Sequence, residues 1–505
     1  MQTDQVVRMG TAQGRWVLAA TILASGMALL DGTVVNVALR VIGADLGADL
    51  ADLQWVVNAY MLTLASLILV AGALGDLLGR RRVFLIGVVW FAAASVLCGL
   101  AQEPLLLIVA RALQGVGGAL LTPGSLAILQ ASFDRDDRAR AIGAWSGLGG
   151  VAAAIGPFVG GWLVQEASWR WVFLINVPLA VTVVVVTLRH VPESCDASVA
   201  GQHVDGLGAG MGALGLAGVT YGLIEAEGGI SASVVAGVTV GALALIAFVR
   251  RQRRAEHPMV PPSLFASRTF SSTNVLTLVV YAALGAMMFF VVLQLQVTLG
   301  YSPFEAGISL APMTVFMLVL SARSGALATR IGPGPQITLG PLVCAAGVLL
   351  LLGVDADSSY LTGVLPGVAV FAAGLTVMVA PLTATVLAAA PDRYAGVASG
   401  VNNAIARTGS LLAVAALPMA VGLGGADYAD PAAFGDGYRA AMAASAALLV
   451  LGALTAFVGL RGTAPTTLAG AEAATEDEVG RGVHDLPHCP LSTARAPAGA
   501  RPDQR

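Results

Sequence analysis

The sequence contains no lysine, so all 27 of its basic residues are arginine. A Walker A nucleotide loop and a Schiff-base enzyme both depend on a lysine side chain, and both are therefore excluded. Charged residues make up only 11% of the 505 positions, and the net charge of −3 offers no basic surface for nucleic acid. The four cysteines all lie away from the predicted outer loops, so no disulfide framework is expected. We expect no cofactor and no bound metal.

What the sequence has in abundance is long apolar runs, because 57% of its residues are hydrophobic. Each run reaches the ~20 residues that a helix needs to cross a hydrocarbon core about 30 Å thick. Core helices of soluble proteins rarely stay apolar on all faces over so many runs. The first run continues past Ala28 to Leu39 without a small-residue cleavage site, so we interpret it as a retained span. The pattern predicts fourteen membrane spans, at residues 16–39, 54–75, 83–101, 105–127, 141–164, 171–188, 207–226, 231–249, 272–297, 305–328, 336–354, 361–387, 396–422 and 440–460.

Arginine residues concentrate in alternate connectors between these spans. If the first connector faces outward, the inner side receives Arg80, Arg81, Arg82, Arg135, Arg138, Arg140, Arg189, Arg250, Arg251, Arg253, Arg254, Arg330 and Arg393. The outer side receives only Arg40, Arg170 and Arg439. Arginine-rich loops stay in the cytoplasm, and an even number of spans places both termini there as well. Together with the arginine-only usage, which suits a GC-rich genome, this predicts a multi-pass protein of a bacterial cytoplasmic membrane.

The two longest connectors divide the spans into six, two and six. We therefore expect an all-α membrane protein of two six-helix bundles with two inserted central helices, because many secondary transporters have duplicated halves. A weak repeat supports this plan, since the segment 72–80 after the second span is echoed by 325–332 after the tenth. The expected divisions are a cytoplasmic N-terminus (1–15), a first bundle (16–190), connectors with the inserted pair (191–270), a second bundle (271–460) and a disordered cytoplasmic tail (461–505).

Asp31 and Arg111 are two charges predicted to lie deep in the membrane. A rise of 1.5 Å per residue places both about 21–22 Å from the inner face. An ionisable group in hydrocarbon costs several kcal/mol and usually marks a proton or substrate path. We therefore predict that Asp31 carries a proton and that Arg111 is its partner. The alternatives are a structural ion pair, or a first span that begins later and leaves Asp31 at the interface.

The connector after the second span is a candidate conformational element. The turn begins at Gly72, and Gly75 and Gly79 permit close helix approach across it. Asp76 precedes Arg80 by four residues, which suits a helix-end ion pair or a lock against a neighbouring span. The alternative is that Arg80 and Arg81 only anchor a cytoplasmic loop.

The fifth span carries a second glycine-rich segment. Pro157 frees a backbone carbonyl, and Gly156, Gly160 and Gly161 permit bending or close packing. A Gly-Pro pair alone is weak evidence, because both residues are common in membrane helices.

Taken in order and at their spacing, these segments resemble the fourteen-span branch of drug:proton antiporters in the major facilitator superfamily. The resemblance is carried by 30–39, Trp55, Tyr60, 72–82, 111–117, Gly143, 156–161, 169–178, 294–307 and 396–403. The chain departs from the pattern at Arg40, where proline is usual, at Ala152, where glycine is usual, and at Thr329, where the second-half loop has an acid. The resemblance implies a rocking mechanism around a central cavity, driven by inward proton flow.

Polar and charged residues within the spans are candidates for lining that cavity: Tyr60, Gln114, Gln294, Gln296, Asn402, Asn403 and Arg407. For most of them the alternative is interhelical hydrogen bonding, worth about 0.6 kcal/mol on average in membranes. The leading functional hypothesis is export of small amphipathic drugs or antibiotics in exchange for protons, by a monomer in the lipid bilayer. Proton-coupled uptake of a metabolite or nutrient is the alternative, although the 156–161 motif argues against it. A non-transporting membrane sensor is the third, for which the mid-membrane charges would be superfluous.

Overall fold

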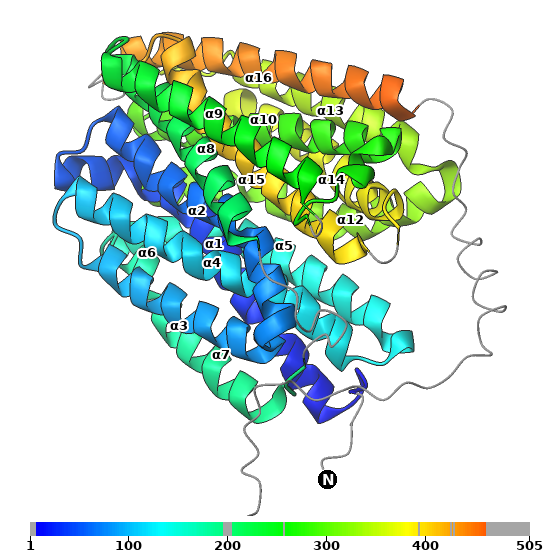
Figure 1. Cartoon of the computed structure of the whole chain (residues 1–505). Coiled ribbons are helices and arrows are strands. Elements are labelled where there is room, and N and C mark those ends of the chain that lie inside the picture. Colours follow the sequence, from blue (N-terminus) through cyan, green and yellow to red (C-terminus); the bar gives the residue numbers. More distant parts are fainter. Residues whose placement is uncertain are drawn as a thin grey trace, which may run out of the picture.

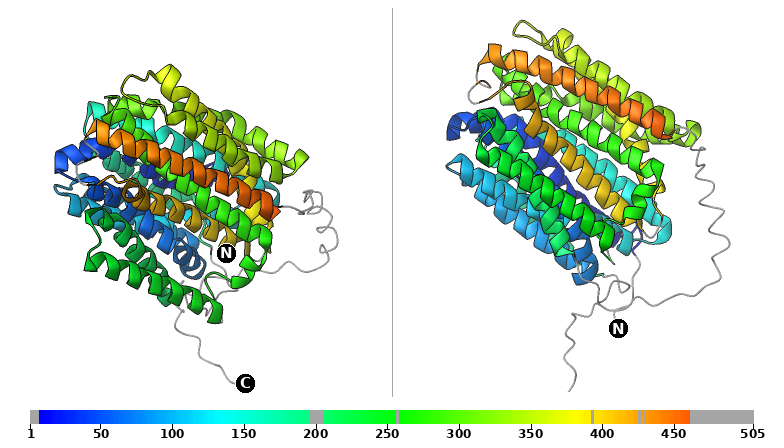
Figure 2. Two further views of the ribbon diagram at one scale, coloured as in Figure 1. Left: turned by 90° about the horizontal axis from the view of Figure 1, so that it is seen from above. Right: turned by 45° about the horizontal axis from the view of Figure 1, so that its top comes forward.

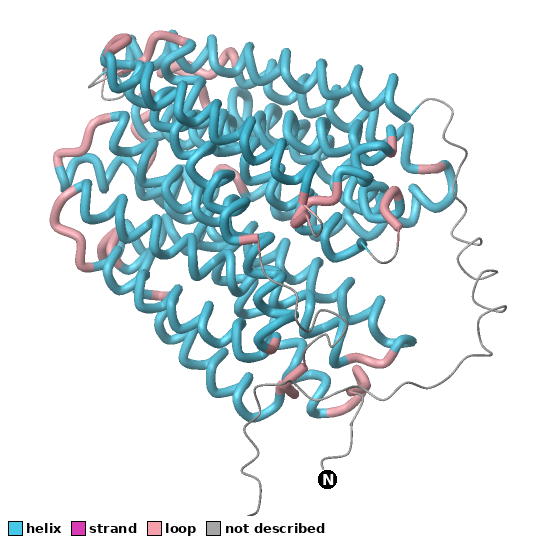
Figure 3. Tube along the Cα trace, in the orientation of Figure 1, coloured by secondary structure: helices cyan, strands magenta, loops and turns pink. Residues whose placement is uncertain are grey.

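The computed structural model describes residues 7–194, 205–255, 258–391, 394–424, 427 and 430–460. Within these residues almost every segment is helical, and the only extended pairing is an isolated bridge between Val7 and Phe133 (Figure 3). The predicted all-α class is therefore confirmed. The predicted tail, 461–505, and the start of the predicted N-terminal segment, 1–6, lie outside the described residues.

The helices follow the predicted spans closely and often extend beyond them. The first group is α1 (Ala12–Leu46), α2 (Leu50–Leu78), α3 (Arg80–Gly99), α4 (Pro104–Ser132), α5 (Arg135–Glu166), α6 (Trp171–Leu174) and α7 (Asn176–His190). The inserted pair is α8 (Gly206–Glu225), followed by η2 (Ala226–Gly228), and α9 (Ala232–Arg254). The last group is η3 (Pro262–Ala266), α10 (Arg268–Val297), α11 (Pro303–Ile308), α12 (Ala311–Ile331), α13 (Pro333–Leu351), the π-helical turn η4 (Tyr360–Val364), α14 (Leu365–Ala388), α15 (Ala395–Ala420) and α16 (Pro431–Leu460).

Twelve helical segments of the described residues are long and apolar enough to cross a membrane. Helices α5 and α15 stand where two further spans, 141–164 and 396–422, are predicted, and are 32 and 26 residues long, but they are not among the twelve. The membrane character is confirmed, and the count of fourteen spans stays a prediction.

Proline interrupts two of the predicted spans. The span predicted at 171–188 is split into α6 and α7, because Pro178 has no N–H to donate to the carbonyl of Leu174. The span predicted at 305–328 is split into α11 and α12 in the same way, since Pro312 cannot bond to the carbonyl of Ile308. Asn176 directly follows the first break and Gly307 lies just before the second, and both residues contact other helices.

The helices pack as two groups that lie side by side (Figures 1 and 2). In the first group α4 packs against α2 and α3, and α1 packs against α5 and α7. In the second group α10 packs against α15 and α16, and α13 packs against α14 and α16. The groups meet where α2 contacts α15, where α5 contacts α11 and α12, and where α1 contacts α10.

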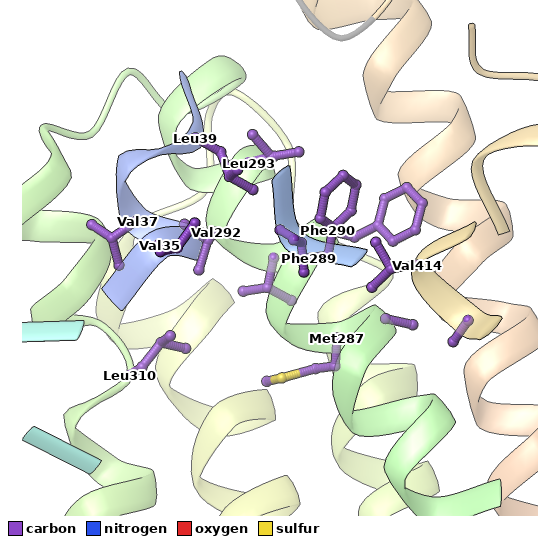
Figure 4. Close-up of a cluster of buried hydrophobic side chains, with 14 of the residues drawn as sticks. Val35, Val37, Leu39, Met287, Phe289, Phe290, Val292, Leu293, Leu310 and Val414 are labelled. Atoms are coloured by element: carbon purple, nitrogen blue, oxygen red, sulfur yellow. The ribbon is translucent and has the colours of Figure 1, made fainter. Parts of the chain in front are cut away.

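The largest hydrophobic cluster extends across this meeting surface. Val35 and Leu39 of α1 lie beside Val292 and Leu293 of α10, and all four side chains are at most 1% exposed (Figure 4). These residues lie toward the C-terminal ends of α1 and α10, which the arginine pattern predicts to be the outer side.

Helices α8 and α9 form a hairpin that covers the α2–α15 contact (Figure 1). At one end the Asp205 carboxylate accepts hydrogen bonds from Gly208 N (2.8 Å), from Arg251 Nε (2.7 Å) and from Gln252 Nε2 (3.1 Å). Burial raises the pKa of the Asp205 carboxyl, but the hydrogen bonds from Gly208 and Arg251 outweigh it and hold this pKa below its usual value of 3.8. At the other end Trp55 Nε1 donates to Glu225 at 3.2 Å, which fixes α8 to α2.

Candidate functional site

Asp31 and Arg111 form an ion pair in the interior of the first helix group. Arg111 NH1 lies 2.5 Å from Asp31 Oδ2, and the two side chains are 1% and 0% exposed. Helices α1 and α4 pack against each other, and the two residues meet at the equal depths predicted from a rise of 1.5 Å per residue. A buried charge pair of this kind is stable only while both partners are present, since removing one leaves an uncompensated charge.

Two amides complete the environment of the carboxylate. Gln114 Nε2 donates to Asp31 Oδ1 at 2.7 Å, and Asn176 Nδ2 donates to the same oxygen at 3.1 Å. Both amides also donate to Ser95 Oγ, at 2.9 and 3.3 Å. Asp31 therefore accepts hydrogen bonds from α4 and α7, and the proline break before α7 leaves Asn176 at the helix start, where it reaches the site.

The guanidinium of Arg111 is held from several directions. Its Nε donates to the carbonyl of Val56 at 3.0 Å, and NH1 also donates to Gln114 Oε1 at 2.6 Å. The ring of Tyr60 lies 4.4 Å from the guanidinium carbon, and the Tyr60 hydroxyl donates to the carbonyl of Ala28 at 3.0 Å. Because Tyr60 and Gln114 are both 0% exposed, they belong to the charge cluster in this conformation and do not line an open cavity.

The connector after α2 contacts the chain after α7. Asp76 pairs with Arg80 within the connector, at 2.8 Å, and no partner for Asp76 from the second helix group is found in the described part of the chain. Gly79 has φ = +105° and packs against Glu193, which also accepts from the backbone N of Arg81 at 3.0 Å. Gly72 lies near Pro123 of α4. The connector thus ties α2, α3 and the segment after α7 together.

The glycines of α5 contact two different helices. A side-chain carbon at Gly156 would overlap Thr33 of α1, and one at Gly160 would lie 2.7 Å from Val34 of the same helix. Gly161 faces the other group, where such a carbon would lie 2.6 Å from the carbonyl oxygen of Pro303. Gly307 of α11 makes the reciprocal approach to the carbonyl of Pro157. The segment 156–161 therefore allows α5 to pack on α1 and on α11 at once.

Two polar contacts also cross between the groups, beside the cluster of Figure 4. Arg40 NH1 donates to the carbonyl of Gln296, and Gln296 Nε2 donates to the carbonyl of Val37 at 2.9 Å. Arg40 thus makes a bond that proline could not make at this position. We refer to Arg40, Gln296, Gly161 and Gly307, with their partners, as the outer seam.

Comparison with known proteins gives the family. Residues 21–414 match the profile described as Major Facilitator Superfamily. The tetracenomycin C resistance and export protein of Streptomyces glaucescens is 35% identical over 414 residues, which are 79% of this chain and 74% of that protein. The methylenomycin A resistance protein of Bacillus subtilis is 34% identical over 424 residues, or 83% and 90% of the two chains. The chain belongs to the major facilitator superfamily.

Two solved transporter structures have the same fold. A bacterial homolog of the lysosomal transporter Spinster, in an inward-facing and unoccupied conformation, aligns with a TM-score of 0.63 over 90% of this chain and 98% of its own, at 18% identity. A peptide transporter of the POT family aligns with a TM-score of 0.65 over 91% and 98% of the two chains, at 14% identity. These likenesses concern the fold alone.

The remaining cavity candidates of this major facilitator protein are placed on α10 and α15. Gln294 is buried and bonds within the second group, donating to Val354 O at 3.0 Å and accepting from Thr298. Asn402 donates to Asn274 and Thr277 of α10, at 3.2 and 2.9 Å, so it links two helices. Asn403 is exposed and Arg407 half-buried on α15. Of the seven candidates, only Asn403 is exposed in this conformation.

Sequence reasoning missed three residues that the structure brings to these sites. Ser95 and Asn176 join the Asp31 cluster, and Glu193 joins the α2–α3 connector. Asn176 lay within a segment that carried the family resemblance, but neutral polar residues are too common in membrane helices to be singled out. Glu193 lies in the connector after a predicted span. An acidic residue is common there, and its contact with the α2–α3 connector cannot be predicted without the fold.

Proposed function

We propose that this protein is a proton-coupled antiporter of the fourteen-helix drug:proton antiporter branch, which exports small amphipathic drugs or antibiotics. The ion pair of Asp31 and Arg111 carries the proposal, because an enclosed carboxylate amid hydrocarbon is a suitable proton carrier. The export direction is supported by relatives named for resistance or export, such as the tetracenomycin C resistance and export protein. A probable actinorhodin transporter of Streptomyces coelicolor is 36% identical over 428 residues. We place the protein in a bacterial cytoplasmic membrane as a monomer with both termini inside, divided at 16–190, 191–270 and 271–460.

The proposed coupling runs along α1. An ionised Asp31 accepts three hydrogen bonds from α4 and α7, which hold α1 against them. A proton on Asp31 turns one oxygen into a donor and removes the charge partner of Arg111, so these contacts rearrange. Val37, six residues later on the same rigid helix, accepts the outer-seam bond from Gln296. Protonation at Asp31 thus acts on the contact between the two halves, as alternating access requires.

The test uses the full chain in proteoliposomes with an acidic interior and a trapped pH-sensitive dye. A neutral naphthalene sulfonamide dye, added outside, should enter those vesicles whose transporters face inside-out, and protons should leave. Asp31→Asn keeps the side-chain shape but cannot ionise, so it should lower proton-coupled dye movement at least tenfold. Asp45→Asn is the matched control: Asp45 is also on α1 and paired with Arg170 at 2.8 Å, but it lies near the helix end, far from the cluster.

Each outcome of this assay has a clear meaning. Proton release on dye addition, lost in Asp31→Asn and kept in Asp45→Asn, supports antiport through Asp31. Entry of dye together with protons would support the second candidate function, proton-coupled uptake. Export by Asp31→Asn at the wild-type rate would show that another group carries the proton.

A further inference from the structure

Arg407 is a positive charge that the proposed proton mechanism does not use. It lies on α15, twelve residues after Ala395, which is about 18 Å along the helix at 1.5 Å per residue. Among the described residues it has no ion-pair or hydrogen-bond partner, in contrast to Arg111, which has both. A charge at this depth normally faces a partner or water, so its lack of a resident partner needs an explanation.

No carboxylate of the second half is in a position to pair with Arg407. In the sequence, the predicted spans of that half contain no aspartate or glutamate except Glu305 at the very start of one of them. Asp31, the carboxylate deep in the first half, is already bound by Arg111. The three deep charges therefore sum to one uncompensated positive charge, which favours an anion.

The surroundings of Arg407 belong to both halves of the protein. The helix that carries it, α15, packs against α2 of the first half and against α10 of the second half. Ser410, one turn along α15, donates to the carbonyl of Tyr281 at 2.9 Å and so fixes α15 beside α10. Arg407 therefore lies where α2, α10 and α15 come together, between the halves that must move in alternating access.

The face of α15 that carries Arg407 also carries an exposed amide. Asn403 stands four residues earlier, hence on the same face, and is exposed, while Arg407 is half-buried. Asn402 points to a different side, toward Asn274 and Thr277. A cation and an amide thus share one face of α15, beside the helix that carries Tyr281, a set that suits an aromatic compound with a negative charge.

We propose that Arg407 binds an anionic group of the exported compound, so that amphipathic aromatic acids are the preferred substrates. This inference rests on the proposed export function and deepens it. The ring of Tyr60 stacks on Arg111, and Tyr60 lies on α2, the helix of the first half against which α15 packs. The anion and the proton then bind at separate sites, the anion at Arg407 on α15 and the proton at Asp31 on α1.

The test compares two dyes of almost equal shape in the proteoliposome assay. One is a naphthalene sulfonate, which stays ionised at all working pH values and so does not follow the pH gradient passively. The other is its neutral sulfonamide. The wild type should export the sulfonate with at least tenfold higher kcat/KM, and Arg407→Gln should abolish that preference while changing sulfonamide export less than twofold. Arg407→Lys keeps the charge and should retain part of the preference, and Arg330→Gln, which removes an exposed arginine at the end of α12, should retain all of it.

The outcomes separate this inference from the function on which it rests. Equal export of both dyes by the wild type, or an equal loss of both in Arg407→Gln, would overturn the anion site while export stands. If neither dye moves under the pH gradient in any variant, the export function itself fails.

Discussion

Arg40→Ala should loosen the outer seam by a predictable amount. The substitution removes the hydrogen bond that the Arg40 guanidinium donates to the carbonyl of Gln296, across the two halves. Bonds to charged groups contribute about 1.5–3 kcal/mol, and because Arg40 is largely exposed we take the lower value, about 1.5 kcal/mol. Since 1.4 kcal/mol is a factor of ten, the population open at this seam should rise about tenfold.

A single reporter cysteine measures this population. Leu39 is 0% exposed and lies beside Leu293 in the seam (Figure 4), so a cysteine placed there reacts only when the seam opens. In a background without the native cysteines, Leu39→Cys would be labelled on intact cells with a membrane-impermeant maleimide. If opening is fast relative to labelling, the labelling rate follows the open fraction and should increase about tenfold in Arg40→Ala.

Arg170→Ala is the matched control for this experiment. Arg170 lies on the same predicted side, but it bonds within the first helix group, to Asp45 at 2.8 Å and to the carbonyl of Ala101 at 3.2 Å. Its removal should lower thermal stability without changing the labelling rate. The reasoning fails if Arg40→Ala is labelled at the wild-type rate, or if Arg170→Ala accelerates labelling as strongly.

Two further predictions concern other contacts. Gly161→Val should force α5 away from Pro303 of α11 and reduce export strongly, whereas Gly143→Val on the same helix, where the added carbon meets open space, should export normally in the proteoliposome assay. Equal export by the two variants would count against the close packing. The lowered pKa of Asp205 should stabilise the folded protein above about pH 3.8, and this stabilisation should be lost as the pH falls through the folded-state pKa. In thermal unfolding, Asp205→Asn should therefore be less stable than the wild type at neutral pH and equally stable below that pKa, and a constant difference would contradict the assignment.

The class of fold could be predicted from the sequence because membrane helices are long and apolar. Helix positions followed from the apolar runs, although several helices extend beyond them, and Pro178 and Pro312 each split a predicted span in two. These two breaks could not be predicted from hydropathy, because the missing backbone N–H of a proline interrupts a helix without changing the hydropathy of the apolar run.

The candidate site divides by the kind of signal that each residue gives. Asp31 and Arg111 were recognisable singly because an ion in hydrocarbon is costly. Equal depth made each the natural partner of the other, but their contact depends on the packing of α1 against α4, which the sequence does not show. Gln294 and Asn402 give no such signal, since a buried amide bonds equally well within a bundle or beside a cavity. Whether Asp76 locks against a neighbouring span depends on which helices touch, and the sequence does not show this. The sequence alone could suggest only the pairing of Asp76 with Arg80, four residues later.

The burial of Asp31 has a consequence for the proton gradient of the cell that makes this protein. The carboxylate of Asp31 is surrounded by donors from two helices and is 0% exposed. If Asp31 is the proton carrier that we propose, it has no contact with water on either side of the membrane in this conformation. A transporter that waits for its substrate in this state does not short-circuit the proton gradient that drives ATP synthesis. The same hydrogen bonds that hold α1 in place thus let the cell keep many copies of an idle exporter in its membrane without a continuous leak.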